Sequence, residues 1–235
     1  MKRVLILSLL LLALAVGLPA QTVGGGVSVF LPESLYRDGE GSVSVETALQ
    51  TSFGLGEFLS FPIGVSYNQI YGLKPAAAEL GAGVRPWFYA DNIQPFLMAQ
   101  LRVGIDRFYV DVFGGGALSW NPVIRPLTKN IEGDLASIVA TTEDSSISFV
   151  GDPAVQNSLG YGWLAGGGFG LNIQGVDIDL NATYKSMTHG VVITGDYYEV
   201  PSGTETQSFS SNSKLSNFRV LLRGLTIGIN GAIAM

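Results

Sequence analysis

Long stretches in which apolar residues alternate with polar or small ones recur along almost the whole chain after residue 21. Successive side chains of a β-strand point to opposite faces of the sheet, so this period of two predicts strands with one apolar and one polar face. Helical periodicity is scarce. The alternation predicts eight strands, at residues 22–30, 42–53, 58–70, 95–104, 108–120, 159–173, 176–188 and 214–233.

The connections between these strands alternate in length. The short ones are 54–57, 105–107 and 174–175, and the long ones are 31–41, 71–94, 121–158 and 189–213. With an even number of strands, all short turns lie on one rim together with both chain ends, and all long loops lie on the other. Transmembrane β-barrels have this arrangement, with the long loops extracellular. We therefore expect an all-β, eight-stranded, antiparallel up-and-down transmembrane barrel.

The polar face of the predicted strands carries both signs of charge. Eight strands enclose a lumen that side chains alone can fill, and an unpaired charge there would be costly. Four acidic and four basic residues balance one another, which predicts a paired lumen network that packs the barrel. Its members are Glu46, Arg102, Asp111, Asp177, Asp179, Lys185, Arg219 and Arg223.

Aromatic residues of the apolar face gather near predicted strand ends. Transmembrane barrels carry such aromatic girdles at the two membrane interfaces, around an apolar band that faces lipid. The predicted interface aromatics are Phe53, Tyr67, Phe108, Trp120, Tyr161, Trp163, Tyr184 and Phe218.

Glycine marks three places in the predicted strands. The glycine-rich segments 114–116 and 166–170, the second interrupted only by Phe169, leave lumen positions without side chains, which makes room for large partners such as Tyr109. In the last strand the apolar positions change phase near Gly224, from Val220 and its neighbours before it to Ile227 and its neighbours after it. A β-bulge at Gly224 would produce that slip.

The first twenty residues have the form of a secretory signal peptide. Lys2 and Arg3 form a basic start, residues 4–16 are almost entirely apolar, and Ala20 is a small residue at the expected cleavage site. The alternative, a membrane anchor, needs an apolar run of about 20 residues, which is longer than this one. We expect residues 1–20 to be a signal peptide and residues 21–235 to be the barrel domain.

Composition excludes several classes of function. The chain has no cysteine, so it has neither disulfides nor a thiol nucleophile, and its net charge of −6 argues against binding to nucleic acid. The single histidine, His189, is expected at the start of a loop, and Ser186 lies on the opposite side of the strand. Asp177 and Asp179 are expected in salt bridges. The sequence therefore predicts no catalytic residue, no metal or cofactor, and no enzymatic activity.

Signal peptide, strand number, girdles and loop asymmetry together resemble the small eight-stranded outer-membrane proteins of diderm bacteria, the group that includes the transmembrane domain of OmpA, OmpX and OmpW. The resemblance implies location in the outer membrane, contact with its lipid, and assembly by the barrel-assembly machinery. It implies a structural or adhesin-like surface role, or a narrow channel for small solutes. Loops 121–158 and 189–213 are then candidates for binding a host or cell-surface ligand.

Two alternatives remain open at this point. One is an OmpW-like carrier of small hydrophobic molecules, which needs an apolar lumen. The other is a soluble periplasmic β-barrel that binds a ligand inside, which needs the two faces inverted.

Overall fold

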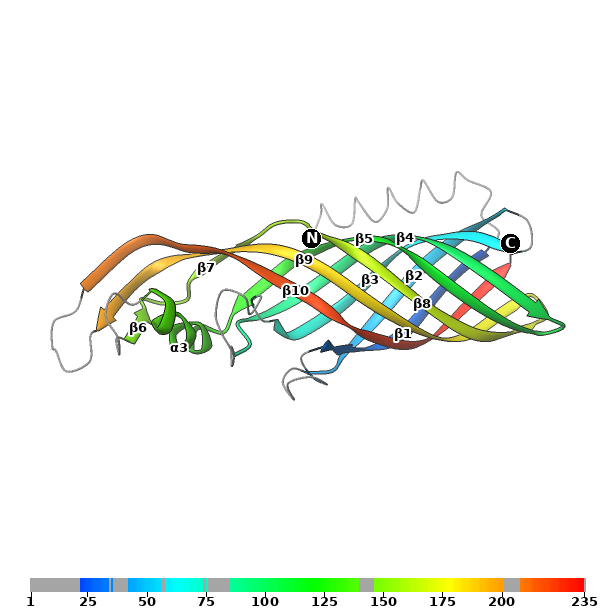
Figure 1. Cartoon of the computed structure of the whole chain (residues 1–235), viewed down its shortest axis with the longest axis horizontal. Coiled ribbons are helices and arrows are strands. Elements are labelled where there is room, and N and C mark those ends of the chain that lie inside the picture. Colours follow the sequence, from blue (N-terminus) through cyan, green and yellow to red (C-terminus); the bar gives the residue numbers. More distant parts are fainter. Residues whose placement is uncertain are drawn as a thin grey trace.

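Eight antiparallel strands close into a barrel in the computed structural model, which describes residues 22–33, 35, 42–55, 58–73, 75, 85–139, 146–200 and 208–234 (Figure 1). Pairing of β1 with β10 closes the ring. The strands are β1 (Thr22–Pro32), β2 (Ser44–Leu55), β3 (Leu59–Leu73), β4 (Phe88–Ile105), β5 (Phe108–Pro126), β8 (Gly160–Ile173), β9 (Val176–Val200) and β10 (Ser208–Ala234). All eight predicted strands are confirmed. The predicted signal peptide, residues 1–20, lies outside the described residues.

Several strands are longer than predicted, and most of the extra length is at the long-loop end. Residues 88–94 belong to β4, whereas 189–200 and 208–213 belong to β9 and β10, so their assignment to loops was wrong. β9 and β10 pair with each other along this whole extension, which satisfies the backbone hydrogen bonds outside the ring. Among the described residues, no helix is both long and apolar enough to cross a membrane.

Tight turns join β4 to β5 and β8 to β9, as predicted. Asp106 and Gln174 adopt positive φ values of 59° and 54°, and Gly175 follows at 85°, as two-residue hairpin turns require. The predicted turn at 54–57 is only partly within the described residues.

A small extension covers the long-loop end of the barrel. Figure 1 shows the β9–β10 hairpin projecting beyond the ring, with α3 (Thr128–Val139) and β6 (Ser146–Phe149) beside it. β6 and β7 (Ala154–Asn157) both pair with the projecting part of β9. The helical turns predicted at 131–140 are present as the greater part of α3; residue 140 lies outside the described part.

The outward face of the ring is apolar, as predicted. Leu49, Leu97 and Ile229 are 65%, 55% and 61% exposed, and their outward neighbours on each strand are mostly aliphatic. We call this surface the outer belt. A continuous apolar surface of this size would aggregate in water, whereas it is what a membrane-spanning barrel presents to lipid. The soluble barrel with inverted faces is thereby excluded.

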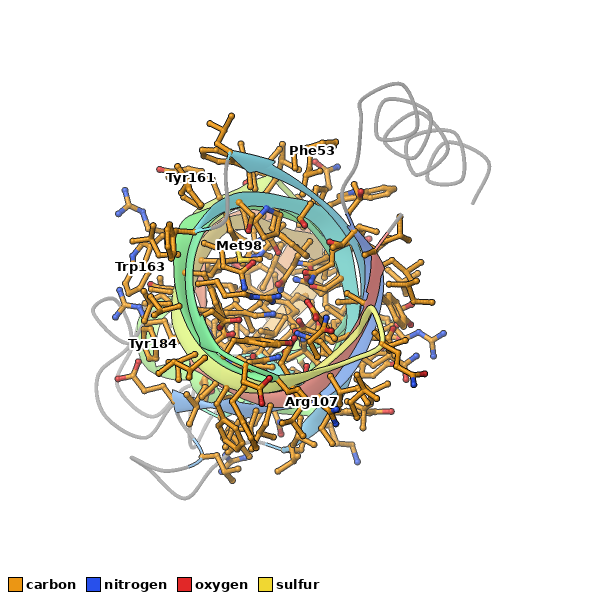
Figure 2. The ribbon with its side chains drawn as sticks, turned by 90° about the vertical axis from the view of Figure 1, so that its right-hand side faces the viewer. Phe53, Met98, Arg107, Tyr161, Trp163 and Tyr184 are labelled. Atoms are coloured by element: carbon orange, nitrogen blue, oxygen red, sulfur yellow. The ribbon has the colours of Figure 1, made fainter. Side chains whose placement is uncertain are left out.

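Most predicted interface aromatics lie outward at the edges of this belt. Figure 2, viewed from the short-turn end, shows Phe53, Tyr161, Trp163 and Tyr184 outside the ring. Tyr161 is 71% exposed, and the ring centroids of Trp163 and Tyr184 lie 5.6 Å apart. Tyr67 and Phe108 are also exposed, and Trp120 is half-buried.

Phe218 is the exception among these aromatics. It is 3% exposed, and its ring contacts Trp87 at 4.9 Å between centroids. Its placement in the girdle was therefore wrong.

The upper part of β10 faces the opposite way from the prediction. Arg219 and Arg223 point outward, whereas Val220 and Leu222 are buried inside. The register with β9 runs without interruption through Gly224, and the irregularities lie higher, between Ser210 and Ser213 and between Lys214 and Ser216. The predicted bulge at Gly224 is wrong, because both faces of the strand change polarity at this level while the backbone stays regular.

Candidate functional site

The barrel interior changes character along its axis, and each zone is built from inward positions of several strands. A polar cavity occupies the short-turn end, a layer of buried amide side chains follows, and an apolar cluster fills the long-loop end. In Figure 2 Met98 points into this interior from the ring wall.

The cavity has a volume of about 210 Å³ and extends to the short-turn end, where Thr22 and Ala232 line it. Arg102 of β4 is its central cation. The guanidinium forms an ion pair with Asp177 of β9, lies 3.6 Å from Asp111 of β5, and stacks over the Tyr109 ring at 3.8 Å. Arg102 therefore ties three strands together across the lumen.

Neutral side chains complete this network. The Gln100 amide donates to Asp111 at 2.8 Å, and Asn172 donates to Asp177 at 2.6 Å. Asp179 accepts from Asn181 at 3.2 Å and from the Tyr109 hydroxyl at 3.5 Å. These hydrogen bonds satisfy carboxylate oxygens whose burial without a partner would cost free energy.

Glycine makes the room that Tyr109 needs, as the sequence predicts. A Cβ on Gly170 would lie 2.4 Å from the Tyr109 ring, and one on Gly166 would lie 2.9 Å from Phe113. Any side chain at these positions would displace the aromatic rings that fill the lumen.

A second ion pair closes the inner end of the cavity. Lys185 of β9 donates to Glu46 of β2, and the two side chains are each 6% exposed. Lys185 also donates to the Gln94 amide oxygen at 3.3 Å. Within the described part of the chain, Glu46 Oε2 and Gln94 Nε2 have no hydrogen-bond partner, which is typical of a site that holds ordered water.

The cavity is more acidic than predicted. Of the predicted lumen charges, the structure brings together six, and Arg219 and Arg223 are absent because they point to the outside. The balance of four acids against four bases was therefore wrong, since only Arg102 and Lys185 remain to face the four carboxylates. This surplus of carboxylates favours water and hydrated cations over anions inside the cavity.

A layer of amides lies beyond the Glu46–Lys185 pair. The Asn92 amide nitrogen donates to the Ser119 hydroxyl and to the side-chain amide oxygen of Asn121, both at 2.8 Å. Asn68 is 1% exposed, and both its amide atoms lack a partner among the described residues. The prediction of a loop at 88–94 hid this layer, although Asn92 and Gln94 continue the alternation of the following strand.

His189 belongs to the same layer and is not at the start of a loop. It is 1% exposed within β9, 3.5 Å from the Asn121 amide, and it fills the space that Gly160 leaves without a side chain. Ser186 faces outward on the same strand. The structure thus places the two on opposite sides of the sheet. No group of three or more His, Asp or Glu side chains in the described ranges is arranged to hold a metal ion.

The apolar cluster closes the long-loop end of the interior. Trp87, Ile131 and Leu135 are 0% exposed, and α3 brings the last two over the barrel mouth. The helix is fixed by polar bonds: Asp134 accepts from the Trp87 indole at 2.7 Å, and Glu132 accepts from the Phe149 backbone at 2.7 Å. Other members of the cluster include Phe30, Ile70, Leu73, Phe88, Met187, Ile193, Phe218, Val220 and Leu222.

One solved structure shares this architecture. The outer membrane protein OprG from Pseudomonas aeruginosa superposes with a TM-score of 0.54 at 11% sequence identity, over 91% of this chain and 95% of that chain. The chain has the fold of a small outer-membrane β-barrel. A major outer membrane protein from Thermus thermophilus gives a TM-score of 0.48 at 11% identity, over 91% of this chain and 99% of that one. The sequence matches no protein-family model and no curated protein at a significant level.

Proposed function

We propose that this protein is an integral barrel of the bacterial outer membrane that conducts no solute and presents a rigid sheet at the cell surface. The apolar cluster carries the proposal, because it fills the lumen at the long-loop end with side chains that are almost fully buried. The polar cavity below it is then a cup open only toward the periplasm. Lipid surrounds the outer belt, and the barrel-assembly machinery inserts the chain.

The extension supports a surface role. β9 and β10 are 25 and 27 residues long, whereas about 9–11 residues cross a membrane as a tilted strand. The remaining length is held in a sheet with β6 and β7, so it is an ordered platform for binding. The Tyr198 and Phe209 rings lie 5.0 Å apart on this sheet and are 38% and 53% exposed, as aromatic anchors for a ligand are.

A carrier of small apolar molecules is the weaker candidate. The upper lumen is apolar, contrary to the ionic lumen that the sequence predicts throughout. However, Trp87, Phe88 and Met187 are 0% exposed there, so a cargo would have to displace packed side chains.

Conductance tests the closed lumen. We expect the purified barrel to give no steady ion conductance in planar lipid bilayers, because water and ions have no polar path through the apolar cluster. Replacing residues 128–139 with a flexible linker removes α3 and uncovers the mouth. The conductance of this variant tests whether the apolar cluster below the helix blocks ions without it. Stable channels from the wild-type protein would contradict the proposal.

Epitope insertion tests the orientation. An epitope placed after Gly151, between β6 and β7, is expected to bind antibody on intact cells, because this turn belongs to the extracellular sheet. The matched insertion between Gln174 and Gly175, in the β8–β9 turn, should bind antibody only after the outer membrane is permeabilised. The reverse pattern, or equal labelling of both, would overturn the proposed surface role.

A further inference from the structure

Two outward arginines lie at the upper edge of the outer belt. Below them on β10 the outward residues are Leu225, Ile227 and Ile229, and with Arg223 the outward face becomes basic. Arg219 is four residues further, roughly 13 Å along the strand at about 3.3 Å per residue. Their position follows from the uninterrupted register of β10 with β9, so the two side chains project from one face.

Arg223 is at the level of the aromatic girdle. It pairs directly with Ser186 of β9, and Ser186 pairs with Trp163 of β8. Tryptophan at this position in a barrel marks the height of the lipid headgroups. Arg223 is therefore at headgroup height, and Arg219 lies further along the tilted strand, toward the water.

Hydroxyl groups of β9 lie beside the two arginines, and the outward residue between the arginines on β10 itself is Leu221. The outward residues of β9 beside them are Ser186 and Thr188, and Thr188 pairs with Leu221 midway between Arg219 and Arg223. We call Arg219, Arg223, Ser186 and Thr188 the headgroup patch. Neither arginine forms an ion pair within the part of the chain that the structure describes. A nearby carboxylate, Glu33, accepts from the Tyr184 hydroxyl at 3.3 Å.

We infer that the headgroup patch binds the phosphate of a membrane lipid in the leaflet at the long-loop end. Guanidinium groups bind phosphate oxygens with paired hydrogen bonds, and the serine and threonine hydroxyls donate to the same group. The acyl chains of that lipid then run down the outer belt over Leu225 and Ile227, which fixes the lipid at one place on the barrel. This inference rests on the proposed membrane location.

Lipid retention in native mass spectrometry tests the site. The full barrel, folded in a neutral detergent, is mixed with phosphatidylglycerol or with phosphatidylcholine of the same acyl chains, and a third sample receives inorganic phosphate. We expect bound phosphatidylglycerol in the wild-type protein, weaker phosphatidylcholine, and no retained phosphate ion. Arg219→Gln and Arg223→Gln should each weaken phosphatidylglycerol binding about five-fold, and the double variant roughly 25-fold, as expected for basic residues at an anionic lipid surface.

Arg107→Gln is the matched control, because Arg107 is an exposed arginine in the β4–β5 turn at the opposite end (Figure 2). It should leave binding unchanged. Equal loss from Arg107→Gln, unchanged binding in the double variant, or equal retention of both lipids would overturn the inference. Flotation with phosphatidylcholine vesicles distinguishes failure of this inference from failure of the proposed function. A barrel that inserts into the vesicles but prefers neither lipid refutes only the headgroup patch, whereas a barrel that does not insert refutes the proposed membrane location.

Discussion

Lys185→Met lowers the free energy of unfolding by about 3–5 kcal/mol at neutral pH, because it leaves the Glu46 carboxylate buried without its counter-charge. Both side chains are 6% exposed and lie at the inner end of the cavity, so hydration can restore only part of the stabilisation that Lys185 gives the Glu46 carboxylate. The Gln94 amide oxygen loses a hydrogen-bond donor in the same variant. Urea unfolding of the barrel in detergent micelles, followed by the circular dichroism of its strands, measures the change.

The double variant Glu46→Gln/Lys185→Met is the control for this effect. It removes both charges at once, and replacement of a whole buried pair is often neutral. We therefore expect it to lie within about 1 kcal/mol of the wild-type protein. A single variant that costs no more than the double one would mean that the pair is solvated and contributes little.

Trp87→Ala destabilises the closed end of the barrel by about 3–5 kcal/mol, the usual cost of removing a large aromatic side chain from a packed core. The centroid of the Trp87 ring lies 4.9 Å from that of Phe218 and 6.1 Å from that of Phe88. The indole nitrogen donates to Asp134 of α3. Its loss leaves a cavity and releases the helix that covers the mouth. The same unfolding experiment measures it.

Two aromatic controls separate packing from the hydrogen bond. Trp87→Phe keeps most of the ring and loses only the bond to Asp134, so we expect a loss of about 1 kcal/mol. Trp163→Phe alters a tryptophan that is 51% exposed on the outer belt and should be nearly neutral. A small effect from Trp87→Ala would contradict a closed, well-packed cluster and would weaken the proposed non-conducting role.

Most members of the polar network could be predicted from the sequence, whereas the pairs that they form could not. The alternation predicts that Glu46, Arg102, Asp111, Asp177, Asp179 and Lys185 share a face, and the structure places all six in the cavity. Pairing of Arg102 with Asp177, or of Lys185 with Glu46, joins residues 75 and 139 positions apart. Those pairings depend on how far each strand is shifted against its neighbours around the ring, which side-chain periodicity does not specify.

The apolar cluster was the hardest feature to predict. Trp87 and Leu135 lie in connections whose hydrophobic residues have no strand period, and they become a core only because α3 lies over the mouth. The continuation of β4 through 88–94 was obscured because its inward face carries Phe88, Ala90 and then Asn92, which mixes apolar and polar residues on one side.

Strand number, up-and-down order and the lipid-facing belt were determined by the sequence. The alternation of side chains and the lengths of the connections are local properties, and both can be measured along the sequence without knowing which strands pair. Only the tertiary structure decided which face of upper β10 is inside. There the lumen turns apolar just where the outside turns polar, so the same alternation fits either orientation. The continuous register with β9 resolves it: Phe218, Val220 and Leu222 complete the apolar cluster, and Arg219 and Arg223 point outward at the membrane edge.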